Sequence, residues 1–169
     1  VVGMPAYRSM SGVWPGFNVP AADPNLDYNY PLAINASYHY LLPLFFSKAT
    51  EQQRAQIETT YANNLSTYSK NVSQDIIARS EARGAEVAEI IWNYAKTDAI
   101  GHEHYLDPFQ GYDWREHTSA AGHWEPTFPG PGEAMGGVWG KARTFALKSD
   151  AEKICAAPIP FSEDTKSEF

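Results

Sequence analysis

The chain has 169 residues, 43% of them hydrophobic and 14% aromatic, which suits one domain or part of a larger one and argues against disorder. Its net charge of −7, from 20 acidic and 13 basic residues, argues against a general nucleic-acid binder and against attraction to anionic lipid, because both need a basic surface. No apolar run approaches the ~20 residues of a membrane-spanning helix, so no transmembrane segment is expected.

Cys155 is the only cysteine, which excludes an internal disulfide. Both a reducing compartment and a secreted protein that does without disulfides are compatible with this count. The chain begins with Val1 rather than Met, and no charged segment precedes an apolar one near its start. We therefore expect that the true N-terminus is missing.

Glycine and proline divide the chain into three parts. Residues 1–31 hold three Gly and five Pro, and residues 101–169 hold eight Gly and six Pro, whereas residues 32–100 hold only Pro43 and Gly84. Because both residue types interrupt helices, the middle part is expected to be a helical core. An irregular N-terminal segment precedes it, and long packing loops follow it.

Two helices are predicted in the first half of this core. Apolar residues recur at near-helical spacing from Leu32 to about Phe46, and Pro43 is expected to kink this helix or to restart it. A second helix is expected to begin after Thr50, with a glutamine three residues on that can complete a capping box, and to run to about Tyr68. Its mostly polar faces predict a surface helix.

The third predicted helix is the clearest element, with Ser73 as its N-cap and an end near residues 99–101, where Gly101 is expected at the C′ position. Its stripe at helical spacing consists of Ile76, Ile77, Ser80, Gly84, Val87, Ala88, Ile91, Tyr94, Ala95 and Asp98. The small residues at 80, 84 and 88 predict a close approach of another helix, since a glycine inside a helix costs about 1 kcal/mol relative to alanine.

Residues 122–149 are too rich in Trp, Pro and Gly to be helical. A simple linker would not carry Trp124, Phe128, Trp139 and Phe145. The segment therefore predicts an ordered loop that packs on a larger body. Trp124, Trp139 and Phe145 are expected to be its packing anchors rather than parts of a site.

His102 and His104 are the weak metal-ligand candidates of the chain. Two histidines at i and i+2 suit a metal held by a loop, and Asp98 or Asp107 could add an oxygen ligand. Paired histidines in a loop are more often surface or helix-capping residues. We therefore expect no metal site here, and the scattered basic residues predict no cluster that could hold an oxyanion.

Four pieces follow one another between residues 80 and 160. They are Ser80-Glu-Ala-Arg-Gly84-Ala-Glu-Val-Ala88-Glu-Ile-Ile91 leading to Asp98, Gly122-His-Trp124-Glu-Pro126-Thr127-Phe-Pro129, Trp139-Gly-Lys-Ala-Arg143-Thr-Phe145-Ala-Leu-Lys-Ser149, and Ala157-Pro158-Ile-Pro160. This order resembles the helical region that precedes the active-site half of vanadium-dependent haloperoxidase-like proteins, in the superfamily of type 2 phosphatidic acid phosphatases and bacterial acid phosphatases. The resemblance covers roughly residues 30–160, and its specific motifs lie between about 76 and 160.

The resemblance implies a mainly α-helical fold and a site in which a Lys, two Arg, a Ser-Gly-His segment and a further His hold vanadate, or phosphate in the phosphatases. This chain has no Arg-Pro and no Pro-Ser-Gly-His, and Arg79 and Arg83 have no His after them before His102. No catalytic or cofactor-binding residue of the family can therefore be carried over. The resemblance places those residues beyond Phe169, so vanadate is expected in the parent enzyme and not on this chain.

The sequence thus predicts a mainly α fold, a helical-bundle portion with long ordered Trp/Pro/Gly-rich loops, within a larger helical fold. Its function is either that of the N-terminal or middle portion of a haloperoxidase-like or acid-phosphatase-like enzyme, or that of a non-catalytic helical interaction or scaffold module. The first hypothesis gives it two partners, the C-terminal half of the same protein and a small-molecule substrate. It also predicts that the stripe Ser80/Gly84/Ala88 packs against the other half of a helical bundle, which is absent or lies in another segment. A homo-oligomer stays open, and export is favoured because such relatives are often exported.

Overall fold

The computed structural model describes residues 14, 16–109, 111–117, 121–127, 129–130, 132–144, 147 and 149–168. Its α-helices are α1 (Tyr30–Phe45), α2 (Glu51–Tyr68) and α3 (Gln74–Lys96), and its short 3-10 turns are η2 (His104–Leu106), η3 (Trp114–His117), η4 (Trp139–Lys141) and η5 (Asp150–Lys153). The described residues include no β-strand, so the predicted mainly α fold class is confirmed. None of the helices in the described part of the chain has the length and apolar character of a membrane span.

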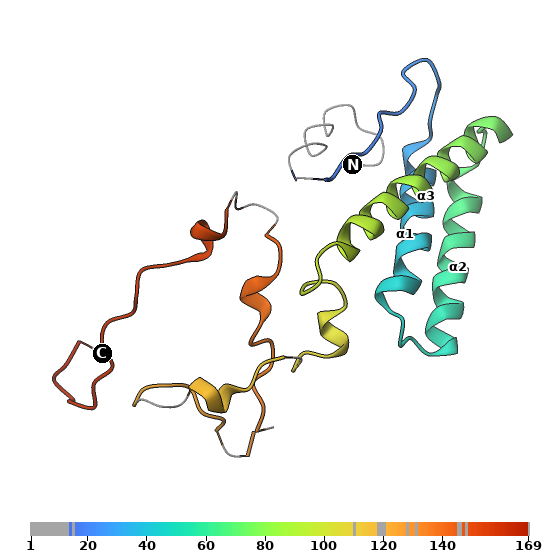
Figure 1. The fold of residues 1–169 in the computed structure, drawn as a ribbon. Coiled ribbons are helices and arrows are strands. Elements are labelled where there is room, and N and C mark those ends of the chain that lie inside the picture. The colour runs from blue at the N-terminus through green and yellow to red at the C-terminus, as the bar shows by residue number, and fades with distance from the viewer. Residues whose placement is uncertain are drawn as a thin grey trace. The chain divides into compact units, whose positions relative to one another are not determined.

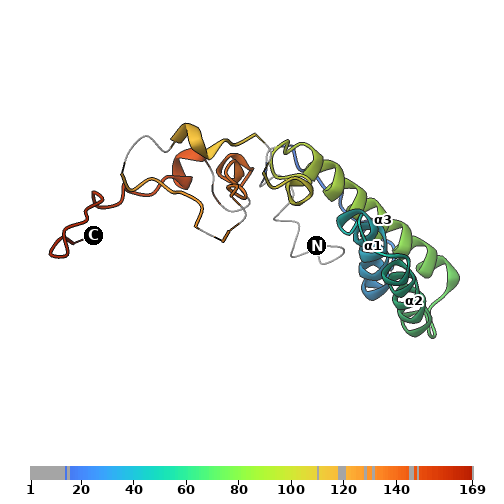
Figure 2. The ribbon, with the colours of Figure 1, turned by 90° about the horizontal axis from the view of Figure 1, so that it is seen from below.

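The chain divides into two compact units, residues 1–96 and residues 97–169, and we call them the helical unit and the loop unit. In the helical unit α1 contacts both α2 and α3, and the three helices lie side by side (Figures 1 and 2). The loop unit carries only the short 3-10 turns among its described residues. The architecture thus separates a regular scaffold from a region of ordered irregular backbone.

Local signals set the start of α1 and keep it continuous. The Asn29 side chain caps the helix by accepting a hydrogen bond from the backbone N–H of Leu32 (3.1 Å). Pro31 lies in the first turn, where its missing N–H costs nothing. Pro43 does not restart the helix, because it lies two residues before the end at Phe45, where the loss of one backbone hydrogen bond interrupts little.

The helix α2 begins with the predicted capping box. Thr50 Oγ1 accepts from the backbone N–H of Gln53 (3.3 Å), and Gln53 Oε1 accepts from the backbone N–H of Thr50 (2.9 Å). No residue of this helix is buried. The prediction of a surface helix is therefore confirmed.

The small-residue stripe of α3 is the contact surface for α1. A Cβ added at Gly84 would lie 2.0 Å from the carbonyl oxygen of Ala33, so only a residue without a side chain allows this approach. Ser37 Oγ also donates to the carbonyl oxygen of Gly84 (2.8 Å). The expectation that this stripe packs on an absent half is wrong, because α1 of the same chain already fills it.

The core of the helical unit lies at this contact. It consists of the buried residues Leu32, Ala33, Ala36, Ile77, Val87, Ala88 and Trp92. The ring of Phe45 packs edge-on against Trp92 (5.5 Å between centroids). Before the helices, buried Phe17 packs on Tyr94 (5.0 Å between centroids), which ties this segment to α3.

The end of α3 comes earlier than the sequence indicates. The helix ends at Lys96, so Gly101 is not its C′ residue, contrary to the prediction. Gly101 has another role, since a Cβ there would lie 2.4 Å from Oδ2 of Asp98. The glycine is thus placed to allow close approach of its backbone to a carboxylate.

We predict that Gly84→Ala destabilises the helical unit by about 1–3 kcal/mol, because the new methyl group overpacks the backbone of Ala33. Helix propensity alone predicts the opposite sign, a stabilisation of about 1 kcal/mol. Chemical unfolding followed by circular dichroism measures the difference. The matched control is Gly140→Ala, whose Cβ meets nothing within 4 Å and leaves stability nearly unchanged. A stabilised Gly84→Ala protein would contradict the close contact.

Candidate functional site

The carboxylate of Asp98 organises the described part of the loop unit. Its Oδ1 accepts from the backbone N–H groups of Ile100 (3.2 Å) and Gly101 (3.0 Å). Its Oδ2 accepts from the backbone N–H of Arg143 (2.9 Å), which is 45 residues away in sequence. One side chain thus joins the turn at residues 97–101 to the Trp-Gly-x-x-Arg motif, and we call this arrangement the Asp98 clasp.

Two basic side chains strengthen the same junction. Arg143 Nη1 donates to the hydroxyl oxygen of Thr97 (2.6 Å), so the arginine is bound to the turn through both its backbone and its side chain. Lys153 Nζ donates to the carbonyl oxygens of Ala142 (2.9 Å) and Gly140 (3.3 Å), and it pairs with Asp150 (2.7 Å). The motif is therefore held from both sides by charge-assisted hydrogen bonds.

The environment of Asp98 favours its ionised form. Partial burial acts to raise the pKa of this carboxyl, but the backbone N–H groups of Gly101, Arg143 and Ile100 outweigh burial and lower the pKa below its ordinary value. The nearby Arg143 guanidinium acts in the same direction. Asp98 is accordingly an acceptor that keeps its charge, suited to holding backbone and not to transferring a proton near neutral pH.

The histidine candidates do not assemble a metal centre. His102 Nε2 lies 3.8 Å from Oε1 of its neighbour Glu103. The His104 ring packs against Trp139 (5.2 Å between centroids), and its Nε2 is buried without a hydrogen-bond partner. The described residues contain no group of three or more His, Cys, Asp or Glu side chains that could hold a metal ion. Asp98, the suggested oxygen donor, binds backbone N–H groups instead.

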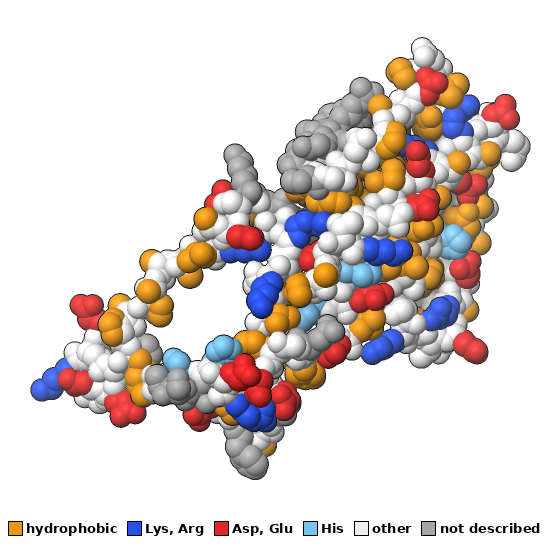
Figure 3. Space-filling view, viewed as in Figure 1, with side chains coloured by type: hydrophobic (Ala, Val, Ile, Leu, Met, Phe, Trp, Pro, Cys, Tyr) orange, Lys and Arg blue, Asp and Glu red, His pale blue; other side chains and the backbone are white. Residues whose placement is uncertain are grey.

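The expected aromatic anchors are only partly covered. Trp124 packs edge-on against Trp114 (5.8 Å between centroids), whose Nε1 donates to the carbonyl oxygen of Gly132 (3.0 Å). Trp124 nevertheless keeps 55% of its surface exposed, and Trp139 keeps 57%. Hydrophobic side chains are visible on the surface of both units, interspersed with charged ones (Figure 3). Phe128 and Phe145 lie outside the described residues.

The described arginines are held in separate contacts. Each described arginine binds a neighbour of its own, and the contacts are Arg54 with Ser47 and Ala49, Arg79 with Asp27, Arg83 with Glu86 and Pro20, Arg115 with Asp113 and Glu133, and Arg143 with Thr97. An oxyanion site instead needs several cationic donors that converge on one point. The described arginines do not converge in this way.

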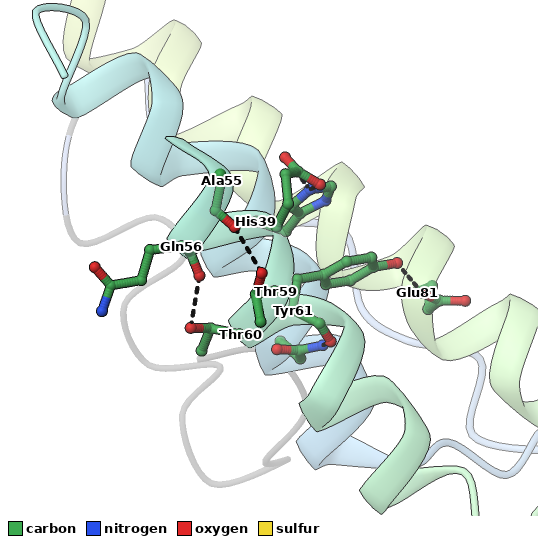
Figure 4. A network of polar contacts seen from close by, with 9 residues as sticks. His39, Ala55, Gln56, Thr59, Thr60, Tyr61 and Glu81 are labelled. Carbon is green, nitrogen blue, oxygen red and sulfur yellow. Dashed lines mark hydrogen bonds and ion pairs between the residues drawn. The ribbon is translucent and has the colours of Figure 1, made fainter. Parts of the chain in front are cut away.

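A second polar cluster, which the sequence did not suggest, joins the three helices (Figure 4). The imidazole Nε2 of His39 on α1 lies 3.0 and 2.9 Å from the two carboxylate oxygens of Glu58 on α2. The same ring stacks on Tyr61 (3.9 Å between centroids), and the Tyr61 hydroxyl donates to Glu81 on α3. We call these four residues the interhelix cluster.

The interhelix cluster changes the chemistry of its tyrosine. The hydrogen bond to Glu81, followed by burial and the charges of Glu81 and Glu58, raises the pKa of Tyr61 to about 12. The phenol therefore stays protonated and acts as a hydrogen-bond donor. No sequence pattern identifies this cluster, because its members come from three helices whose facing sides are not known in advance.

Comparison with known proteins adds no relative: no protein-family model, no curated protein and no solved structure matches this chain.

We predict that Asp98→Asn releases the Trp-Gly-x-x-Arg motif from the turn, because an amide nitrogen in place of Oδ2 cannot accept from the Arg143 backbone. The lost charge-assisted bond costs about 1–2 kcal/mol, and hydrogen exchange of the Arg143 amide measures it. Asp113→Asn is the matched control, since that carboxylate binds the backbone only within its own turn. If the Arg143 amide exchanges as slowly in Asp98→Asn as in the unmodified chain, the Asp98 clasp is contradicted.

The clasp is also expected to weaken in acid. Because the pKa of Asp98 is lowered in the folded state, the clasp contributes its full stability above the unfolded-state pKa of about 4. That contribution is lost as the pH falls through the lower, folded-state pKa. An NMR titration should show the Arg143 amide shift moving only below about pH 4, whereas movement confined to pH 5–7 would point to another group.

Proposed function

We propose that this chain is the α-helical N-terminal or middle portion of a vanadium haloperoxidase-like or acid-phosphatase-like enzyme. The parent reaction is halide oxidation by peroxide or phosphoester hydrolysis. The observation that supports the proposal is the Asp98 clasp, which joins two pieces of the resemblance, the turn that follows the Ser80–Ile91 motif and the Trp139–Arg143 motif. Asp98, at the end of the first piece, and the Trp139–Arg143 motif thus belong to one built arrangement.

In this proposal the chain has a structural role, and the catalytic residues lie in the rest of the protein. Its described arginines bind neighbours of their own, so we place the Lys, Arg and His groups that would hold vanadate or phosphate elsewhere in the enzyme. The part-exposed Trp124 and Trp139 are available to pack on that remainder. The partners of the chain are accordingly its own C-terminal half and, through it, a small-molecule substrate.

A second candidate is a non-catalytic helical scaffold module, and one observation favours it. The residues Ile77, Ser80, Gly84 and Val87 of α3 are buried against elements of the same chain. The helical unit therefore has a core of its own and does not need an absent half to cover this face. A module that folds alone and binds a partner would have this property.

Sequencing the gene beyond the codon for Phe169 separates the two candidates. The enzyme proposal expects a Lys with a following Arg-Pro, then a Ser-Gly-His, then an Arg followed by a His. A termination codon directly after Phe169 would overturn it and leave the scaffold candidate.

For the product of the whole gene, vanadate distinguishes the two parent reactions. A haloperoxidase is expected to oxidise bromide with peroxide only after vanadate is added, whereas a phosphatase is expected to hydrolyse p-nitrophenyl phosphate and to lose activity with vanadate, because vanadate competes for the phosphate site. The chain of residues 1–169 alone is the control and is expected to show neither activity. Full activity of this control would contradict the proposal that the catalytic residues lie outside residues 1–169.

A further inference from the structure

The helix α2 is attached to the helical unit with very little apolar burial. It has 18 residues, and none of them is buried. The residues that face α1, among them Ile57, Tyr61 and Asn64, line an open groove together with Ile34 and Tyr38. In contrast, α1 and α3 share a core of fully covered side chains such as Leu32 and Val87. Apolar burial is the main source of tertiary stability, so α2 receives much less of it than its neighbours.

Polar contacts hold α2 in place instead. Asn35 Nδ2 donates to the carbonyl oxygen of Tyr61 (3.0 Å), and Asn64 Nδ2 donates to Oδ1 of Asn35 (3.0 Å). Near the end of α2, Asn29 Nδ2 donates to the carbonyl oxygen of Tyr68 (3.3 Å). The interhelix cluster supplies the remaining cross-links, His39 with Glu58 and Tyr61 with Glu81. Contacts of this kind at a partly hydrated site contribute about 0.5–1.5 kcal/mol each.

The helix α2 also has hydrogen bonds of its own, which do not depend on α1 or α3. Its capping box satisfies the first turn. The hydroxyls of Thr59, Thr60 and Thr67 donate to carbonyl oxygens four residues earlier in the same helix (2.8 Å each). At its far end the chain turns at Asn71, which has φ 61°, a left-handed conformation that suits a short connection. The helix is therefore bounded by turns at both ends and internally bonded along its length.

We propose that α2 is an arm that undocks from α1 and α3 as a unit, with the interhelix cluster as its latch. Undocking breaks few contacts and leaves the core between α1 and α3 intact. It further exposes the side of α1 that lines the groove, where Leu42 is half-buried and Ile34 and Tyr38 are already exposed. The device belongs to the helical unit and does not depend on the proposed function.

Native-state hydrogen exchange of the chain tests the arm directly. Amides of α2 from Ile57 to Leu65 are expected to exchange at least about tenfold faster than those of α3 from Ser80 to Ala88, after correction for intrinsic rates. The opening of α2 should also depend less on added denaturant than the opening of α3, because it exposes less surface. Equal protection in both helices, with equal denaturant dependence, would show one cooperative unit and overturn the proposal.

The latch is tested by Tyr61→Phe, which removes the donor to Glu81 and keeps the ring that stacks on His39. Exchange in α2 is expected to become about fivefold faster, with α3 unchanged. Thr59→Ala is the matched control, because its hydroxyl bonds only to Ala55 within α2 and takes no part in docking. If amide exchange in Tyr61→Phe becomes faster by the same factor in α2 and α3, the latch is overturned. If that variant fails to fold, the comparison of α2 with α3 in the unmodified chain still decides whether α2 opens separately.

Discussion

The close contact of α1 and α3 at Gly84 is the constraint on which the helical unit depends. The carbonyl oxygen of Ala33 occupies the space that a side chain at position 84 would need. This approach allows Ser37 to bond across the interface to the backbone of α3, and Ser80 Oγ to accept from the backbone N–H of Asn29. Buried hydroxyls that bind backbone groups satisfy polar atoms in a place that water does not reach. The packing of Leu32 and Val87 then follows from the short distance between the two helices.

Different forces hold the other parts of the chain. Apolar packing joins α1 to α3, and hydrogen bonds join α2 to both. One carboxylate with three backbone donors joins the turn at residues 97–101 to the Trp-Gly-x-x-Arg motif. Apolar packing resists opening because it exposes large surfaces to water, whereas a polar contact can be exchanged for water at small net cost. The stability of the chain is therefore uneven along its length, and the regions held by polar contacts are the ones able to rearrange.

The sequence predicted the features that depend on neighbouring residues. The Thr50 cap, the start of α2 and its surface position all follow from patterns a few residues long, and the structure confirms them. It also predicted that Gly84 permits a close helix approach, but it named the wrong partner for that approach. The pairing of Ser37 with Gly84 spans 47 residues, and no local pattern identifies which helix faces the stripe. The early end of α3 at Lys96 was missed because Asp98 looked like part of the helical stripe, although it binds the turn and the Arg143 backbone.

For the candidate site, too, the sequence shows short motifs but not the contacts between distant segments. The Trp-Gly-x-x-Arg motif is visible in the sequence, but its attachment to Asp98 depends on backbone that lies 45 residues away. By itself the sequence determined the approximate positions of the three helices and the cap of α2, because these properties belong to short segments. Only the tertiary structure decided that α1 fills the α3 stripe, that Asp98 holds Arg143, and that His39, Glu58, Tyr61 and Glu81 meet. Contacts of this kind form only when distant segments share one place in space, and the free energy of the whole fold selects them.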